Sequence, residues 1–471
     1  MTIPGFGSAS APRGWGLALS VSLLVAACGG GSDSAPASGG GSATTLSAAA
    51  QLGQKIFNDT ALSVSGAQSC ASCHVAASAF AEDASASGVD HGSPVPLGGP
   101  GMNQTGFRNT PSLMYASLIP AFYIASDGSP NGGFFRDGRA ATLEAQAVLP
   151  FTTSFEMANA DASAVVAKLK TRPYLADFET LYGAAVLADP TTALNRMGQA
   201  LAAFERENPA FHPFSSKYDF FQKGQVQLTA QELRGLALFN DATKGNCSAC
   251  HPSTSGDGVN PPMFTDFSYD NLGVPRNSLI PANAASAPDG TPVNSDDGVQ
   301  TYYDLGVCGP FRAQTVDFFS SCGQFKVPTL RNIAVTAPYF HNGRFTTLKD
   351  AIGFYVRRDT NPEEWYPANP DGTVTKFDDL PAVYGGQFVV TPGVAGSDAG
   401  YLGNVNTSEI PYNRHIGDTP ALAPDEIDDV ITFLCTLTDG FDPANPNAQV
   451  LPAQCQAAVH AAAAPNNSKS R

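Results

Sequence analysis

Two groups of reactive side chains share one pattern, Cys-x-x-Cys-His, in this chain of 471 residues. Two thiols one turn apart can bond the two vinyl groups of a porphyrin, and the adjacent histidine can ligate the iron. A zinc site would need a second pair of ligands nearby, and a thioredoxin-like pair needs no histidine. The pattern therefore predicts two covalent c-type haems, attached at Cys70, Cys73 and His74 and at Cys247, Cys250 and His251.

A short apolar run near the N-terminus indicates export. Residues 17–27 end in Val-Ala-Ala directly before Cys28, which looks like a bacterial lipoprotein signal cut before a lipidated cysteine. The run is too short to span a bilayer. We expect a signal peptide over 1–27 and a flexible Gly/Ser tether over 28–45. Gly29 after the cysteine favours a periplasmic protein anchored by lipid to the outer membrane, with a soluble periplasmic form as the alternative.

Four cysteines remain once the haem-bound and lipidated ones are set aside. An even remainder in an oxidising compartment suggests disulfides. Proximity in the sequence favours the pairs Cys308–Cys322 and Cys435–Cys455. Four free buried thiols are the alternative.

The balance of charge limits the partners. The chain carries 26 basic and 42 acidic side chains, a formal charge of −16. Phosphate binding needs basic patches, so nucleic acid is excluded as a partner. A negative surface would speed association with a cationic redox protein, and plain solubility explains the charge equally well.

Helices must hold the two pentads, and the stretches that lead to them repeat. Each stretch has Phe-Asn-Asp four residues after a glycine, with Gly53 before Phe57 in the first and Gly235 before Phe239 in the second. A helix of this kind packs its aromatic residue near the porphyrin edge. We therefore expect a duplicated haem-binding domain.

Further helical signals lie on either side of the second pentad. Thr229 and Glu232 predict a capping box that opens the helix before it. Helical periodicity appears over 162–169 and 194–204, and again in a closing helix that carries Ile427, Val430, Ile431 and Leu434.

Long stretches rich in Gly, Pro and Asp, over 252–299 and 367–411, indicate surface loops. The sequence thus predicts a mainly α protein, with two cytochrome-c-like haem domains and long irregular loops. The expected bounds are 46–222 for the N-terminal domain, 223–441 for the C-terminal domain and 442–471 for a partly disordered tail.

Three further blocks stand in order with the pentads. They are Phe107-Arg108-Asn109-Thr110-Pro111-Ser112-Leu113, Asp137-Gly138-Arg139-Ala140 with the residues up to Met157, and Phe325–Asn332 leading into Pro338-Tyr339-Phe340-His341-Asn342-Gly343. With these blocks the chain resembles the bacterial dihaem cytochrome c peroxidases, a family that includes the MauG-type enzymes. The resemblance implies that the N-terminal haem is peroxidatic and that the C-terminal haem transfers electrons.

The resemblance places three distal residues over the first haem: Glu156, Gln146 and Pro150. Cleaving an iron-bound peroxide requires moving a proton between its oxygens, and a buried carboxylate can do this as general acid and base. A neighbouring amide can hold the peroxide by a hydrogen bond, and proline narrows the pocket. Without the family match, Glu156 reads as a solvated loop acid and Gln146 as a residue on a helix surface.

The second haem departs from the common pattern. Many relatives ligate this iron by a methionine fourteen residues after the Tyr-Phe-His block, whereas here that position is Tyr355 and the last methionine is Met263. The resemblance to MauG implies that Tyr355 is the distal ligand, and a hard phenolate lowers the potential of the iron. A core tyrosine on a helix is the alternative.

Two more positions depart from the family. Arg136 stands where many relatives have the tryptophan that bridges the haems. Trp365, the only tryptophan after the signal, is favoured as a packed loop residue, with an electron port as the alternative. His91 could be a removable distal ligand of the first haem, although a solvated loop histidine is favoured by its spacing.

Family members also bind calcium between their domains. The resemblance places the calcium ligands at Asn109 through its side chain, and at Thr336 and Pro338 through backbone carbonyls. Such oxygen donors, completed by waters, suit calcium.

Taken with the resemblance, these residues predict a peroxidase that reduces hydrogen peroxide to water. Electrons would arrive through the second haem from a small cytochrome c or a cupredoxin. One alternative is a MauG-like oxidase that modifies an oxidisable partner protein, and another is a non-catalytic dihaem electron carrier. The resemblance also implies a possible homodimer.

Overall fold

The computed structural model describes residues 45–82, 94–280, 283, 302–312 and 319–462. The chain from Leu46 onward packs as one compact unit. The predicted signal peptide, almost all of the predicted tether and His91 lie outside the described residues. None of the helices in the described part of the chain is both long and apolar enough to cross a membrane.

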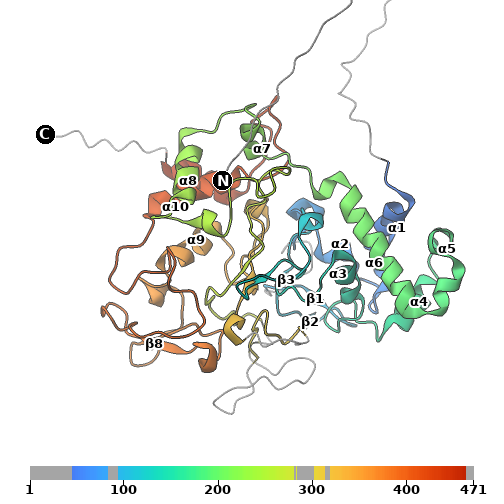
Figure 1. Cartoon of the computed structure of the whole chain (residues 1–471), viewed down its shortest axis with the longest axis horizontal. Coiled ribbons are helices and arrows are strands. Elements are labelled where there is room, and N and C mark those ends of the chain that lie inside the picture. The colour runs from blue at the N-terminus through green and yellow to red at the C-terminus, as the bar shows by residue number, and fades with distance from the viewer. Residues whose placement is uncertain (1–44, 83–93, 281–282, 284–301, 313–318, 463–471) are drawn as a thin grey trace, which may run out of the picture. The chain divides into compact units, whose positions relative to one another are not determined.

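Short α-helices joined by long irregular segments make up most of the described chain (Figure 1). The N-terminal half contains α1 (Ala48–Phe57), α2 (Cys70–Cys73), α3 (Leu143–Val148), α4 (Ala162–Leu169), α5 (Leu175–Tyr182) and α6 (Pro190–Glu207). The C-terminal half contains α7 (Lys217–Gln222), α8 (Ala230–Asn240), α9 (Leu348–Arg357), α10 (Pro424–Cys435) and α11 (Ala453–Ala462).

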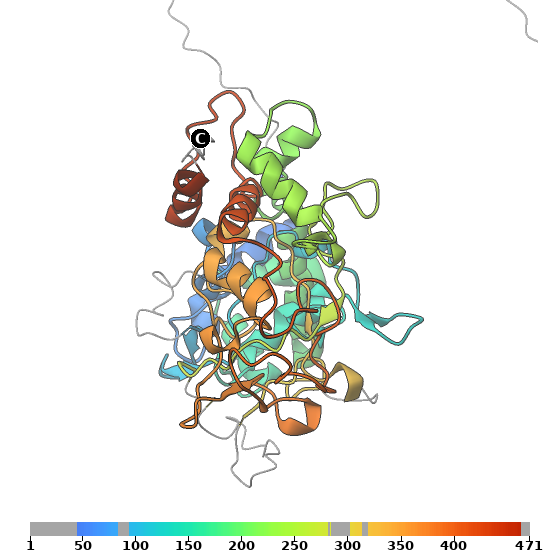
Figure 2. The ribbon, with the colours of Figure 1, turned by 90° about the vertical axis from the view of Figure 1, so that its left-hand side faces the viewer.

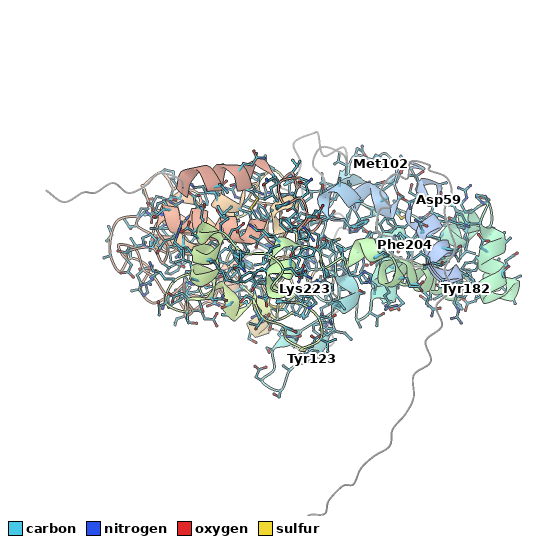
Figure 3. The ribbon with its side chains drawn as sticks, turned by 90° about the horizontal axis from the view of Figure 1, so that it is seen from above. Asp59, Met102, Tyr123, Tyr182, Phe204 and Lys223 are labelled. Carbon is cyan, nitrogen blue, oxygen red and sulfur yellow. A yellow bond between two sulfur atoms is a disulfide. The ribbon has the colours of Figure 1, made fainter. Side chains whose placement is uncertain are left out.

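The strands are short and occur in four antiparallel pairs. These are β1 (Leu97–Gly98) with β2 (Gln104–Thr105), β3 (Tyr123–Ile124) with β4 (Pro130–Asn131), β5 (Tyr269–Asp270) with β6 (Phe325–Lys326), and β7 (Val374–Lys376) with β8 (Phe388–Val390). The β3–β4 hairpin projects from its neighbours (Figures 2 and 3), and its Tyr123 is half exposed. The mainly α fold predicted from the sequence is confirmed.

Two large groups of buried apolar side chains form the core. One lies between residues 52 and 211 and is built around α1 and α6, and the other lies between residues 218 and 458 and is built around α8, α9 and α10. This division supports the predicted pair of haem domains, whose bounds stay a prediction.

The two cores repeat one helix crossing. In the N-terminal half, α1 crosses α6 where Gly53 faces Ala200, and a Cβ on Gly53 would collide with the Ala200 carbonyl oxygen. In the C-terminal half, α8 crosses α10 where Gly235 faces Asp429, with the same collision. Glycine is needed at both places because only its missing side chain lets the two backbones approach so closely.

An aromatic pair accompanies each crossing. Phe57 packs edge-on against Phe204 with their ring centroids 5.5 Å apart, and Phe239 packs against Phe433 at 5.2 Å. Each pair lies four residues beyond the crossing glycine on one helix and four residues beyond its partner on the other. The repeat predicted from the sequence is therefore a repeat of structure.

Both predicted disulfides are present, Cys308–Cys322 and Cys435–Cys455. The second one joins α11 to α10, and these two helices lie side by side near the C-terminus (Figure 2). Part of the predicted tail is therefore an ordered helix up to Ala462. The sequence did not predict α11, because its residues are mostly small and show no strong apolar stripe.

The predicted capping box at the start of α8 is also confirmed. The Thr229 hydroxyl accepts a hydrogen bond from the Glu232 N–H at 3.2 Å, and the Glu232 carboxylate accepts one from the Thr229 N–H at 2.6 Å.

Candidate functional site

Each pentad forms a single helical turn. The His74 N–H donates to the Cys70 carbonyl oxygen at 2.9 Å, and the His251 N–H donates to the Cys247 carbonyl oxygen at 2.9 Å. None of the four pentad thiols is in a disulfide, and burial raises the pKa of each to about 12. Both turns therefore present two protonated thiols beside a histidine.

The two pentad histidines are held in the same way. Nδ1 of His74 lies 3.0 Å from the carbonyl oxygen of Phe80, and Nδ1 of His251 lies 2.8 Å from that of Phe264. Both phenylalanines have a left-handed backbone with φ of 52°. Burial lowers the pKa of His74 to about 4 and also lowers that of His251. A neutral ring whose Nδ1–H is bound by a carbonyl keeps Nε2 as a metal ligand.

One continuous cavity of about 470 Å³ is lined by both pentads. Its walls are mostly apolar and include aromatic side chains from both halves, among them Phe57, Phe134, Phe155, Phe239, Phe325 and Phe340. Paired thiols, a neutral histidine and apolar walls are what a covalently attached porphyrin needs. The residues present therefore fit two haems.

The three predicted distal residues lie on this cavity. Helix α3 begins at Thr142, whose hydroxyl accepts a hydrogen bond from the Ala145 N–H at 3.2 Å, and it carries Gln146. A 3-10 turn then carries Pro150, and the following turn carries Glu156. The structure thus brings Gln146, Pro150 and Glu156 to the same cavity as the first pentad.

The environment of Glu156 suits proton transfer. Burial raises the pKa of its carboxyl group, while the charge of Arg139 and a hydrogen bond with Thr153 oppose that rise. Arg139 is held by Asp137 at 3.1 Å and lies over the Phe135 ring. A carboxyl group whose pKa is raised is better able to act as a general acid as well as a base.

The second pentad faces an aromatic group instead. Tyr355 on α9 lines the cavity, with its ring centroid 5.5 Å from Phe340 and 5.9 Å from Tyr412. Burial and the neighbouring Cys250 raise the pKa of the Tyr355 phenol, and Arg358 opposes that rise. The structure thus places Tyr355 where the sequence predicts it, on the cavity with the second pentad.

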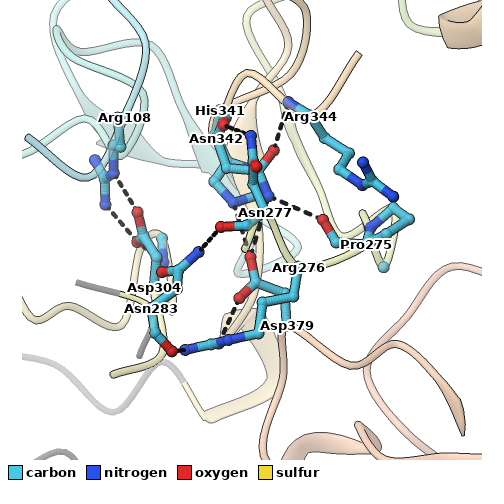
Figure 4. A network of polar contacts seen from close by, with 12 residues as sticks. Arg108, Pro275, Arg276, Asn277, Asn283, Asp304, His341, Asn342, Arg344 and Asp379 are labelled. Carbon is cyan, nitrogen blue, oxygen red and sulfur yellow. Dashed lines mark hydrogen bonds and ion pairs between the residues drawn. The ribbon is translucent and has the colours of Figure 1, made fainter. Parts of the chain in front are cut away.

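Buried ion pairs hold the wall of the cavity (Figure 4). Asp379 accepts hydrogen bonds from Arg276 at 2.7 Å and from the Asn342 amide at 3.2 Å. Arg108 of the N-terminal half donates to Asp304 of the C-terminal half at 2.6 Å. Charge-assisted hydrogen bonds of this kind are strong, so the loops from the two halves are firmly joined here.

The predicted calcium ligands are only partly available. Asn109 lies beside Pro338, because its side-chain amide donates to the Pro338 carbonyl oxygen at 2.5 Å and its N–H donates to the His341 carbonyl oxygen at 2.9 Å. Thr336 lines the same cavity. However, the guanidinium of Arg136 donates to the side-chain oxygen of Asn109 and to its carbonyl oxygen. In this arrangement both oxygens of Asn109 are taken by Arg136, which does not fit their use as calcium ligands.

Sequence reasoning missed a second buried acid at the first site. Glu205 on α6 lines the cavity, is only 4% exposed, and is near enough to Cys70 to raise the pKa of that thiol. Burial raises the pKa of Glu205 itself to about 8. A signal was present, because Glu205 follows Phe204 where Leu434 follows Phe433 in the repeat.

Trp365 is a packed residue, as favoured from the sequence. It is 8% exposed and its ring meets those of Phe345 and Phe354 edge-on, at centroid distances of 5.7 and 5.9 Å.

A Cys-x-x-Cys-His turn, a carbonyl-bound histidine and an aromatic helix crossing together describe a c-type cytochrome site, and this chain contains that arrangement twice. The chain is therefore of the dihaem cytochrome class.

Comparisons with known proteins agree. A family model described as di-haem cytochrome c peroxidase matches residues 47–227. The methylamine utilization protein MauG of Paracoccus denitrificans is 39% identical over 309 residues, which cover 65% of this chain and 74% of that protein. The cytochrome c551 peroxidase of Pseudomonas aeruginosa is 29% identical over 303 residues, covering 64% and 70%. The crystal structure of the diheme peroxidase BthA from Burkholderia thailandensis matches with a TM-score of 0.70 and 35% identity, covering 87% of this chain and 92% of that one.

The chain thus belongs to the bacterial dihaem cytochrome c peroxidase and MauG family. Membership implies two c-type haems.

Proposed function

We propose that this protein reduces hydrogen peroxide to water at its first haem site, with electrons delivered through the second. Cys70, Cys73 and His74 would hold the first haem. Cys247, Cys250 and His251 would hold the second, with Tyr355 as its distal ligand. When bound, the haems supply the iron that takes up peroxide and the two electrons that split its O–O bond.

The chain's own residues move the protons. Glu156 would take a proton from one oxygen of the peroxide and return it to the other, which would leave as water. Gln146 donates a hydrogen bond to the peroxide and Pro150 narrows the space above it. The electron donor then returns to the haems the two electrons that they supplied. Overall, one peroxide, two protons and two electrons give two waters.

One observation carries the proposal. Glu156 lies on the same cavity as His74, and burial raises the pKa of its carboxyl group. An electron carrier needs no acid above either iron, so this group favours an enzyme.

Anaerobic titration of the purified protein with peroxide, followed by a steady-state assay with a reduced cytochrome c, tests this function. We expect a spectral change at the first haem and continuous oxidation of the cytochrome. An unchanged first haem would indicate the electron carrier instead.

A MauG-like oxidase of a partner protein is the second candidate, and Tyr355 together with the 39% identity to MauG favours it. In the same assay, a first haem that reacts with peroxide but a reduced cytochrome c or cupredoxin that is not turned over would favour this candidate.

The tyrosine ligand has its own test. In Tyr355→Phe, we expect the optical and paramagnetic spectra of the His251 haem to change while those of the His74 haem stay as in the wild type. If the spectra of the second haem did not change, Tyr355 would be a packed core residue and not a ligand.

We further propose a periplasmic protein anchored to the outer membrane by lipid on Cys28, which is the cysteine that ends the apolar run 17–27. Mass spectrometry of the mature N-terminus checks the lipid, and Cys28→Ser should release the protein from membranes. Size-exclusion chromatography with light scattering tests the possible homodimer.

A further inference from the structure

The guanidinium of Arg136 contacts Asn109, one of the three predicted calcium ligands. It donates through Nε to the carbonyl oxygen of Asn109 at 3.2 Å, and through a terminal nitrogen to the side-chain oxygen of the same residue. That side-chain oxygen is the ligand which the family resemblance assigns to calcium. The amide nitrogen of Asn109 in turn donates to the carbonyl oxygen of Pro338, the second assigned ligand.

We propose that Arg136 replaces calcium in this protein: its guanidinium takes the Asn109 oxygen that the ion would need, and it holds Asn109 where that residue joins the two halves without a metal. The positive charge then belongs to the protein itself. Asn109 accepts a hydrogen bond from Arg136 and donates one to the Pro338 carbonyl oxygen.

The chemistry of the two cations supports this exchange. Calcium takes six to eight oxygen ligands at 2.3–2.6 Å, and a guanidinium takes oxygen acceptors through five N–H groups in a fixed fork. Both cations therefore compete for the side-chain oxygen of Asn109. They cannot share it, because a doubly charged ion beside an arginine would suffer strong repulsion in a cavity of low polarity.

Two of the neighbouring carboxylates, Asp137 and Asp304, are already paired with other arginines, and Glu82 adds a negative charge that favours the charged form of Arg136. Asp137 forms ion pairs with Arg108 at 2.9 Å and with Arg139 at 3.1 Å, and Asp304 forms one with Arg108 at 2.6 Å. Arg108 also adds positive charge close to Arg136. Burial, with that charge, lowers the pKa of Arg136 to about 9, so the side chain stays protonated at neutral pH.

A calcium ion between the two halves would link them, and the contacts of Asn109, which Arg136 holds, provide such a link. Asn109 belongs to the N-terminal half, and it reaches Pro338 and His341 of the C-terminal half through its amide and its N–H. A side chain that is covalently part of the protein cannot be removed by a chelator or lost on dilution.

Metal analysis of the holoprotein is the first test. After equilibration with calcium chloride and removal of the excess, we expect two irons per chain and no bound calcium. We also expect the melting temperature and haem spectra to be unchanged by the chelator EGTA. One equivalent of calcium, or a lower melting temperature in EGTA, would overturn the proposal.

The second test restores the ion. Arg136→Gln frees the Asn109 oxygens, so we expect this variant to bind one terbium or calcium ion, seen as terbium luminescence and as a calcium-dependent rise in melting temperature. Lys326→Met is the matched control, since it removes another buried cation of the same cavity that makes no described contact with Asn109, and it should bind neither ion. A folded Arg136→Gln protein that binds no ion would also overturn the exchange. If that variant does not fold, the wild-type metal analysis decides alone.

Discussion

The two pentad sites are alike around their histidines and differ in the other residues of the cavity. At each site a phenylalanine carbonyl binds the histidine, and two helices of the same half cross at a glycine. An acid and an amide, Glu156 and Gln146, line the cavity that holds the first pentad, whereas Tyr355 lies in an aromatic group on the cavity wall with the second. The duplicated frame thus repeats the pentad and its histidine, and the segments between its helices differ.

A second difference lies within the repeated helices themselves. Glu205 on α6 occupies the position that Leu434 has on α10. Both side chains are buried, but only the first can carry a charge. The first site therefore has two acids, the half-buried Glu156 and the buried Glu205, whereas the second has Leu434 in place of Glu205.

The strongest test of this difference between the two sites is to remove the Glu156 carboxyl group. Glu156→Gln keeps the shape of the side chain but cannot shuttle a proton, so peroxide turnover should fall by about 10²–10⁴-fold. The spectrum of the second haem should not change. Steady-state peroxidase assays measure the effect, with Glu205→Gln as control. Wild-type turnover in Glu156→Gln would mean that another group moves the proton.

The shared frame predicts equal damage from equal changes. Gly53→Ala and Gly235→Ala each place a methyl group against a facing carbonyl oxygen, at Ala200 and at Asp429. Each variant should lose about 1–3 kcal/mol of unfolding free energy by overpacking. Chemical denaturation measures both. Loss at one glycine alone would show that the two crossings are not equivalent. Gly183→Ala is a poor control because its φ is positive, whereas Gly256, with open space around its Cβ position, is a suitable one.

The buried Glu205 should make the free energy of unfolding depend on pH. Burial raises the pKa of Glu205 to about 8 from an ordinary value of 4.5. Between these values the folded chain keeps a proton that the unfolded chain has lost. Stability is therefore fully present below pH 4.5 and falls toward pH 8, by up to about 1.4 kcal/mol per pH unit.

Glu205→Gln should remove this slope, and denaturation curves between pH 5 and 8 measure it. Leu434→Gln serves as the counterpart in the second half, where any loss of stability should be the same at each pH. An equal slope in the wild type and in Glu205→Gln would show that Glu205 is not the titrating group.

The smallest effects concern the helices that carry the distal residues. Both α3 and α9 begin with a threonine whose hydroxyl caps the helix, Thr142 and Thr347. Replacing either by alanine should cost about 0.5–2 kcal/mol. Thr142→Ala should also weaken peroxide turnover, and Thr347→Ala should disturb only the second haem spectrum. The reverse pattern would contradict the assignment of the distal residues.

Local patterns in the sequence predicted the local features well. The pentads, the capping box at Thr229, the repeated Gly-x-x-x-Phe and both disulfides each depend on residues close together in the chain. The cavity position of Glu156 and Tyr355 followed from the family resemblance, because nothing in their immediate neighbourhood distinguishes them from surface or core residues.

Features that depend on distant contacts were not predicted. Arg136 meets Asn109 twenty-seven positions away, and the burial of Glu205 results from packing of α6 across the cavity rather than from its own helix. Helix α11 is held by a disulfide and by its contact with α10, neither of which its sequence shows.

The spacing of the two disulfides bears on how such a chain matures. Their cysteines are separated by only 14 and 20 positions, and short loops close at a lower entropic cost than long ones. Oxidation will therefore join each of these cysteines to its near neighbour rather than to a distant pentad thiol. This spacing disfavours mispairing of these four cysteines with the pentad thiols.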